Sequence, residues 1–98
     1  MTTRTQTPAE RWTVSSTFND LLVVDDRALA LTLDHLLWVG PVACVLIEEC
    51  AAGPRDLTRL AEVCREAFGE PPGGGLLEAV AGQVAELVES GLLQRVGP

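Results

Sequence analysis

The sequence predicts an α+β fold in which a three-stranded antiparallel sheet is followed by three helices arranged as a winged helix-turn-helix. Two observations favour this fold. The apolar residues change from strand-like alternation to helical spacing near residue 40, and Gly-Pro or Gly-rich breaks separate the helical stretches. With 98 residues the chain can build one modest core. We therefore expect one domain over residues 12–96, after a disordered polar tail over residues 1–11.

The first half of the domain is expected to form an antiparallel meander of three short strands. The stretch 12–26 is rich in β-branched and apolar residues, and its Asn-Asp pair at 19–20 either divides it into two strands or marks a bulge. Residues 28–33 alternate in the manner of a half-buried strand. The last strand, 36–39, follows a tight turn at 34–35 and leads directly into the first helix.

The first helix is predicted to occupy the centre of the fold. Gly40 is its expected N-cap and Pro41 its first residue, since proline is well tolerated at that position. The helix should end before the Gly-Pro pair at 53–54. Residues 42–47 are apolar on almost every side, so this helix must be covered on more than one face.

Two amphipathic helices are expected to follow, separated by a turn. Asp56 is a plausible N-cap for the second helix, and Gly69 supplies its C-terminal stop. The Pro- and Gly-rich residues 70–75 cannot continue a helix. The third helix should span residues 76–90 and end at Gly91.

Charge and cysteine content exclude several classes of function. Fourteen acids against seven Arg and no Lys give a net charge of −7, which disfavours nucleic acid as a partner. No secretory signal and no apolar run long enough for a membrane span is visible, so we expect a cytoplasmic protein that does not bind membranes. We interpret Cys44, Cys50 and Cys64 as small buried hydrophobes, and His35 as a turn residue. No catalytic motif or cofactor fingerprint occurs, and the chain is predicted not to be an enzyme and to need no metal or cofactor.

Four segments carry a resemblance to a known family. They are Trp38-Val39-Gly40-Pro41-Val42-Ala43, Ala51-Ala52-Gly53-Pro54-Arg55-Asp56-Leu57, Leu60-Ala61-Glu62 with Phe68-Gly69, and Val84-Ala85-Glu86-Leu87-Val88-Glu89-Ser90-Gly91-Leu92-Leu93. In their order and spacing the chain resembles the PqqD-like family, also called the RiPP precursor peptide recognition element, over about residues 20–96. Gly40 departs from the pattern, because the family often has Asn there, and the turn at 34–35 is shorter than usual.

The resemblance implies a stand-alone, non-catalytic protein that binds the leader of a ribosomally made precursor peptide. In the family, the leader pairs antiparallel with the third strand and lies between that strand and the third helix, a case of strand addition. The partners implied are the leader peptide and a modifying enzyme such as a leader peptidase or cyclase, and we favour a lasso peptide pathway. The peptide-binding residues would be Leu36, Leu37, Trp38, Val39, Val80, Gln83, Val84 and Leu87, with Trp38 as the anchor.

Each of these residues also has a purely structural interpretation. The aliphatic ones have the periodicity of core residues, and Gln83 could simply be solvated. Two alternative functions remain open. A winged-helix DNA-binding regulator would have to read DNA with residues 76–90, which carry three Glu and no Arg or Lys and would repel phosphate. An acidic scaffold subunit of an enzyme complex would use the same apolar edge without binding a leader.

Overall fold

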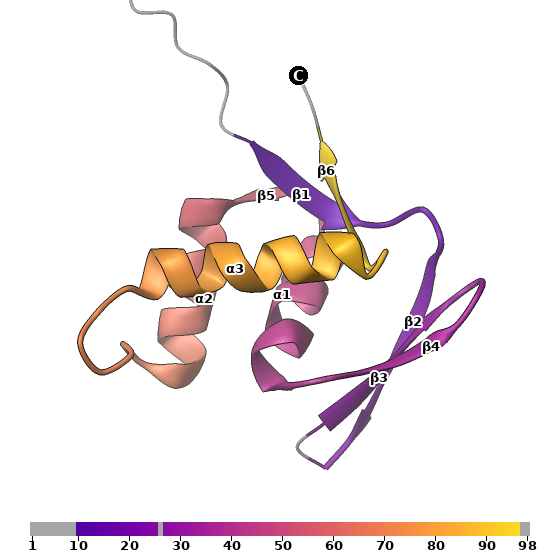
Figure 1. The fold of residues 1–98 in the computed structure, drawn as a ribbon, viewed down its shortest axis with the longest axis horizontal. Coiled ribbons are helices and arrows are strands. Elements are labelled where there is room, and N and C mark those ends of the chain that lie inside the picture. Colours follow the sequence, from indigo (N-terminus) through magenta and orange to yellow (C-terminus); the bar gives the residue numbers. More distant parts are fainter. Residues whose placement is uncertain (1–9, 26, 97–98) are drawn as a thin grey trace, which may run out of the picture.

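The computed structural model describes residues 10–25 and 27–96 and is α+β (Figure 1). Its elements in chain order are β1 (Arg11–Val14), β2 (Phe18–Val24), β3 (Arg27–Thr32), β4 (Leu36–Val39), α1 (Pro41–Ala51), β5 (Arg55–Asp56), α2 (Leu57–Phe68), α3 (Leu76–Glu89) and β6 (Leu93–Val96). The strands form two separate three-stranded antiparallel sheets, with the orders β5-β1-β6 and β2-β3-β4. The expected tail lies outside the described residues up to residue 9, and Arg11 already belongs to β1.

The expectation of one sheet followed by a winged helix-turn-helix is wrong, because the strands divide between two sheets. A turn at 15–17 separates β1 from β2, and the Phe18 amide donates to the Ser15 carbonyl at 3.0 Å. β1 then pairs with the end of the chain, where Val14 lies opposite Leu93. The local sequence of β1 or of β6 does not indicate that strands so far apart in the chain would pair. The Asn-Asp pair at 19–20 does not divide two strands, and the β2–β3 register shifts there instead, between Phe18 and Asp20.

The three predicted helices are confirmed, and their ends have the expected signals. α1 begins after Gly40 with Pro41 in its first turn. At the start of α2 the Asp56 carboxylate accepts a hydrogen bond from the Arg59 amide at 2.9 Å. Gly69 ends α2 at φ +82°, a left-handed conformation that favours glycine.

The core lies between the three helices and is closed by the β5-β1-β6 sheet. Leu46, Ile47 and Cys50 of α1 are fully buried, as is Leu60 of α2. The Thr13 hydroxyl of β1 donates to the Cys50 carbonyl at 3.3 Å, which ties this sheet to the C-terminal end of α1. No helix in the described part of the chain has the length and apolar character needed to cross a membrane.

An ion-pair cluster holds the end of α1 against the start of α2. The Arg55 Nε donates to the Glu49 Oε2 at 2.6 Å, and the Arg59 Nε reaches the same oxygen at 3.2 Å. The Arg55 hydrogen bond is the main reason why the pKa of Glu49 lies below its ordinary value. Nothing in the sequence around Glu49 distinguishes this acid from a solvated one.

The β2-β3-β4 sheet projects from the helices, at lower right in Figure 1. Only one of its faces packs on the core, through Ala28, Ala30 and Thr32 of β3. None of the seven residues of β2 is fully buried. On the face turned away from the core, Leu22 is 48% exposed and Trp38 is 55% exposed.

Candidate functional site

β4 is an edge strand, with β3 on one side and no strand of the described chain on the other. In the turn before it, the Thr32 amide donates to the His35 carbonyl at 3.0 Å, so this pair is hydrogen-bonded. Pairs alternate along an antiparallel ladder, so Leu37 and Val39 direct their N–H and C=O groups toward β3. The N–H and C=O groups of Leu36 and Trp38 therefore point outward at the open edge.

The side chains of β4 alternate between the two faces of the sheet. Leu37 and Val39 are half-buried and pack against the core. Leu36 and Trp38 are on the opposite face and are 59% and 55% exposed. The Arg27 guanidinium lies over the Trp38 ring, 4.4 Å from the ring centre, which is a cation–π contact.

A groove of about 240 Å³ lies between β4 and the C-terminal half of α3. Its walls are Leu37, Trp38, Val39, Gly40, Ala43, Gln83, Glu86, Leu87, Ser90 and Leu92. The groove thus follows the open edge of β4 over most of that strand. A main chain laid along this edge would have the side chains of α3 as its opposite wall.

Five of the eight predicted site residues meet at this groove, namely Leu37, Trp38, Val39, Gln83 and Leu87. The others lie elsewhere. Leu36 is on the edge strand but does not line the groove, and the buried Val80 lines a neighbouring hollow. Val84 is buried and lines a different hollow, beside Trp12 and Arg95, so it faces the β5-β1-β6 side of α3.

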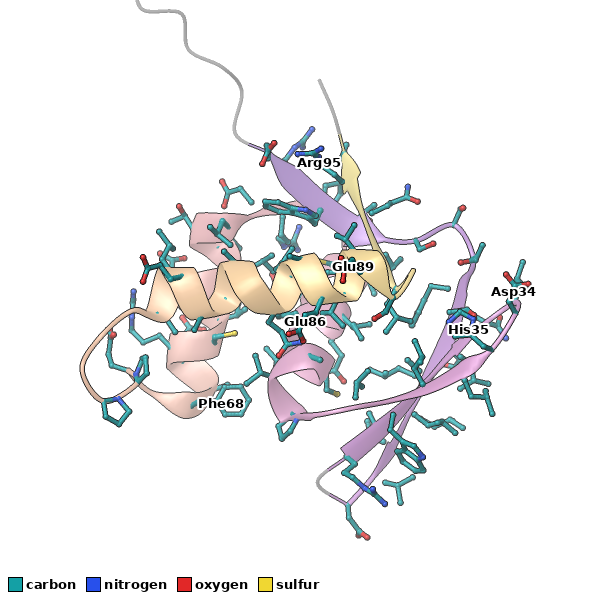
Figure 2. The ribbon with its side chains drawn as sticks, viewed as in Figure 1. Asp34, His35, Phe68, Glu86, Glu89 and Arg95 are labelled. Carbon is teal, nitrogen blue, oxygen red and sulfur yellow. The ribbon has the colours of Figure 1, made fainter. Side chains whose placement is uncertain are left out.

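Sequence reasoning missed the polar residues of the groove. Glu86 and Ser90 line it, and the Gln83 Nε2 donates to the Glu86 Oε1 at 3.4 Å. A signal was available, because Glu86 follows Gln83 by three positions and therefore lies on the same helical face. Figure 2 shows Glu86 and Glu89 on α3 and Asp34 at the tip of the β3–β4 hairpin, and of these three acids only Glu86 lines the groove.

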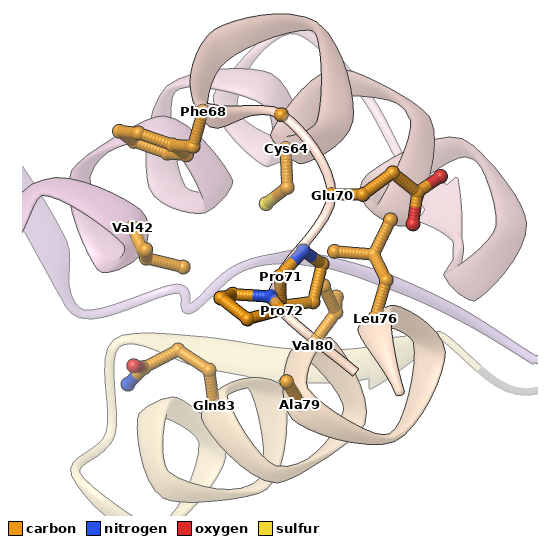
Figure 3. A pocket seen from close by; sticks show the side chains of 11 residues that line it. Val42, Cys64, Phe68, Glu70, Pro71, Pro72, Leu76, Ala79, Val80 and Gln83 are labelled. Carbon is orange, nitrogen blue, oxygen red and sulfur yellow. The ribbon is translucent and has the colours of Figure 1, made fainter. Parts of the chain in front are cut away.

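A second, apolar hollow of about 330 Å³ adjoins the groove (Figure 3). It lies between the first turn of α1, the end of α2, the 69–75 loop and the start of α3. Its walls are Val42, Cys64, Phe68, Gly69, Glu70, Pro71, Pro72, Leu76, Ala79, Val80 and Gln83. Gln83 lines both the hollow and the groove, so the two lie next to each other along α3.

Burial raises the pKa of all three cysteine thiols, that of Cys50 to about 11, so these thiols stay protonated near neutral pH. Within residues 10–25 and 27–96 no three His, Cys, Asp or Glu side chains are grouped to hold a metal ion. The polar groups that converge on the groove are the strand edge, Gln83, Glu86 and Ser90.

Comparison of the chain with protein-family models, curated proteins and solved structures finds no match. A functional inference for this chain therefore depends on its own residues. The most specific feature among them is an open strand edge that faces a groove.

Proposed function

We propose that this chain is a non-catalytic peptide-binding protein that captures the leader of a ribosomally made precursor peptide. The leader would add to the open edge of β4 and lie in the groove beside α3. One observation supports this proposal most strongly: the unpaired edge of β4 lies along a groove that the same strand helps to form. An exposed apolar edge favours aggregation unless it is covered or used.

The physical basis is strand addition. The N–H and C=O groups of Leu36 and Trp38 would bond to the main chain of the leader, independently of its sequence. Alternate leader side chains would enter the groove, where Leu37, Val39 and Leu87 offer apolar contact. In this arrangement Trp38 contributes its backbone at the edge, while its ring contacts Arg27 on the outer face of the sheet.

The nature of the peptide follows from the resemblance to the PqqD-like family. It supports an antiparallel leader and a partner enzyme such as a leader peptidase or cyclase, in a lasso peptide pathway as the favoured case. Such precursors are made and modified in the cytoplasm, where we place this protein. The binding site would comprise Leu36, Leu37, Trp38, Val39, Gln83 and Leu87, with Val80 and Val84 supporting α3 from the core.

The proposal is tested by blocking the strand edge at one amide. In Leu36→Pro the outward N–H is lost, and proline is tolerated at the first residue of an edge strand. Leu36→Ala is the matched control, because it removes the same side chain and keeps the amide. The probes are fluorescein-labelled synthetic peptides copied from the leaders of short precursor genes beside this gene, titrated by fluorescence polarisation.

We expect Leu36→Pro to bind the peptide at least about tenfold more weakly than Leu36→Ala, because one net hydrogen bond and its geometry are lost. Circular dichroism would show that both variants keep the fold. Equal affinity of the two variants would contradict strand addition. Failure of the wild-type protein to bind any of these leaders would contradict leader capture itself.

A scaffold subunit of an enzyme complex is the second candidate, and the outer face of the β2-β3-β4 sheet favours it. Leu22, Leu36 and Trp38 expose apolar surface there, and exposed apolar patches often mark protein interfaces. The same pair of variants separates the two functions. A scaffold that uses this face would lose its enzyme partner equally in Leu36→Pro and Leu36→Ala, as pull-down with that enzyme would show.

A further inference from the structure

The groove and the apolar hollow lie side by side along α3, and we name the two together the α3 channel. Gln83 belongs to both parts and lies at their junction. The part beside β4 ends near Glu86 and Ser90, and the other part ends among Phe68, Pro72 and Leu76 (Figure 3). The channel therefore has an acidic end and an apolar end.

The acidic end offers a carboxylate without an ion-pair partner in the described chain. Five ion pairs occur among the described residues, and none of them includes Glu86. Its hydrogen bond from Gln83 is long, at 3.4 Å, and joins a neutral amide to the charge. A Lys or Arg of a bound peptide could approach Glu86 from the groove without displacing a cation of the protein.

The apolar end offers a site for one large side chain. Phe68 is 50% exposed at the end of α2, and it forms one wall of the hollow opposite α3. Pro71 and Pro72 contribute rigid apolar rings from the loop that follows. Glu70 is the one charged residue among the lining residues, and it is already paired with Arg65 at 2.8 Å. This end of the channel therefore disfavours a charged occupant.

The geometry of α3 sets the order and spacing of the two recognised side chains. From Ala79 at the apolar end to Glu86 at the acidic end the helix rises about 10 Å. An extended peptide covers that distance in about three residues. The apolar end includes Val42 and so lies beyond the carboxyl end of β4. A strand antiparallel to β4 would reach it with its amino-terminal part.

We infer that the α3 channel selects extended segments in which a large apolar residue precedes a Lys or Arg by about two to four positions. The apolar side chain would lie among Phe68, Pro72 and Leu76, and the cation would pair with Glu86. This inference depends on the proposed strand addition and specifies the peptide that β4 captures. It makes Glu86 a specificity-determining residue.

The test is a selection from a phage-displayed library of random dodecapeptides, performed on the wild-type protein and on two charge-reversal variants. Glu86→Arg changes the channel. Glu89→Arg is the matched control, since it makes the same change of charge on the same helix at a residue outside the channel. Peptides that also bind Leu36→Pro are discarded, so that only peptides that need the β4 edge remain. Phe68→Ala tests the apolar end separately.

We expect the wild-type protein and Glu89→Arg to enrich a Lys or Arg at one position, with a large apolar residue before it. Glu86→Arg should replace that preference by Asp or Glu, and Phe68→Ala should lose only the apolar preference. A selected peptide whose cation is changed to Glu should bind the wild-type protein at least about tenfold more weakly at low salt, and Glu86→Arg should reverse that order.

Two results would overturn the inference, and they can be told apart. In the first result, the selected peptides require the β4 edge but show no preference for Lys or Arg, or Glu86→Arg selects the same Lys or Arg as the wild-type protein. Either finding would contradict the role of Glu86 and leave strand addition intact. A selection that yields no binder sensitive to Leu36→Pro would contradict both the inference and the proposed function.

Discussion

The two sheets of this protein differ in what covers them. The β5-β1-β6 sheet packs against the helices, and its Leu93 is buried together with the adjacent Leu92. The β2-β3-β4 sheet is covered on one face only, and its strand β2 has no fully buried residue. One sheet therefore closes the core, while the other leaves an apolar face and a strand edge open to solvent.

If β4 binds a peptide as proposed, the β5-β1-β6 sheet contributes to stability and the β2-β3-β4 sheet to binding. A small domain buries little apolar surface in its core. Apolar surface that stays exposed to solvent therefore leaves the folded state less stable than it would be with that surface buried. The β2-β3-β4 sheet retains such a surface next to the groove that β4 forms with α3. We therefore expect substitutions in the helical core to affect folding and substitutions on the outer face or open edge of this sheet to affect binding.

The largest expected effect comes from the same Leu→Ala truncation made once in the helical core and once on the outer face of the β2-β3-β4 sheet. Leu46→Ala removes a fully buried side chain from α1 and should lower the free energy of unfolding by about 2–5 kcal/mol. Leu22→Ala removes a side chain that is 48% exposed on β2 and should lower it by less than about 1 kcal/mol. Urea unfolding followed by circular dichroism measures both. Similar losses in the two variants would mean that the outer sheet belongs to the same tightly packed core.

A smaller effect is expected in how the free energy of unfolding depends on pH. The hydrogen bond from Arg55 lowers the pKa of Glu49 below its ordinary value of 4.5, so this carboxylate stabilises the folded state above that pH. Its contribution is lost as the pH falls through the lowered pKa and the group becomes protonated. Glu49→Gln should therefore cost about 1 kcal/mol near neutral pH and clearly less at about pH 3.

The measurement is urea unfolding of both proteins at the two pH values. Glu86→Gln serves as the control, because Glu86 has no ion pair in the described chain. It should leave stability nearly unchanged at either pH. A destabilisation by Glu49→Gln that is the same at both pH values would contradict the role given to the Glu49 charge.

The helices of this fold were predictable because their signals are local. Gly40 with Pro41, Asp56 and Gly69 mark helix ends through backbone geometry and capping that need no distant partner. The β3–β4 hairpin was predictable for the same reason, since a short turn joins strands that are adjacent in sequence, although the turn covers residues 33–35 and not only 34–35.

The two-sheet architecture was not predictable, because it depends on a pairing between the two ends of the domain. Trp12 lies opposite Arg95 in the β1–β6 ladder, and nothing in the sequence around either residue indicates the other. Only the packing of α3 and Leu92 brings residues 93–96 beside β1.

The candidate site was predictable in part. An edge strand of four apolar residues next to an amphipathic helix indicated a groove, and Leu37 and Leu87 do meet there. Glu86 was missed although it follows Gln83 by three positions on the same helical face, because the local sequence does not distinguish a helical acid at a groove from a solvated one. The placement of Val84 was missed because rotating a helix by a fraction of a turn moves a residue from one groove to another.

The most direct test of strand addition to β4 is amide hydrogen exchange by NMR, with and without a bound peptide. Strand addition should slow exchange of the Leu36 and Trp38 amides by at least about tenfold, because these N–H groups would bond to the peptide. The Leu37 and Val39 amides, already bonded to β3, should change little. Unchanged exchange at Leu36 and Trp38 under a saturating peptide would contradict strand addition.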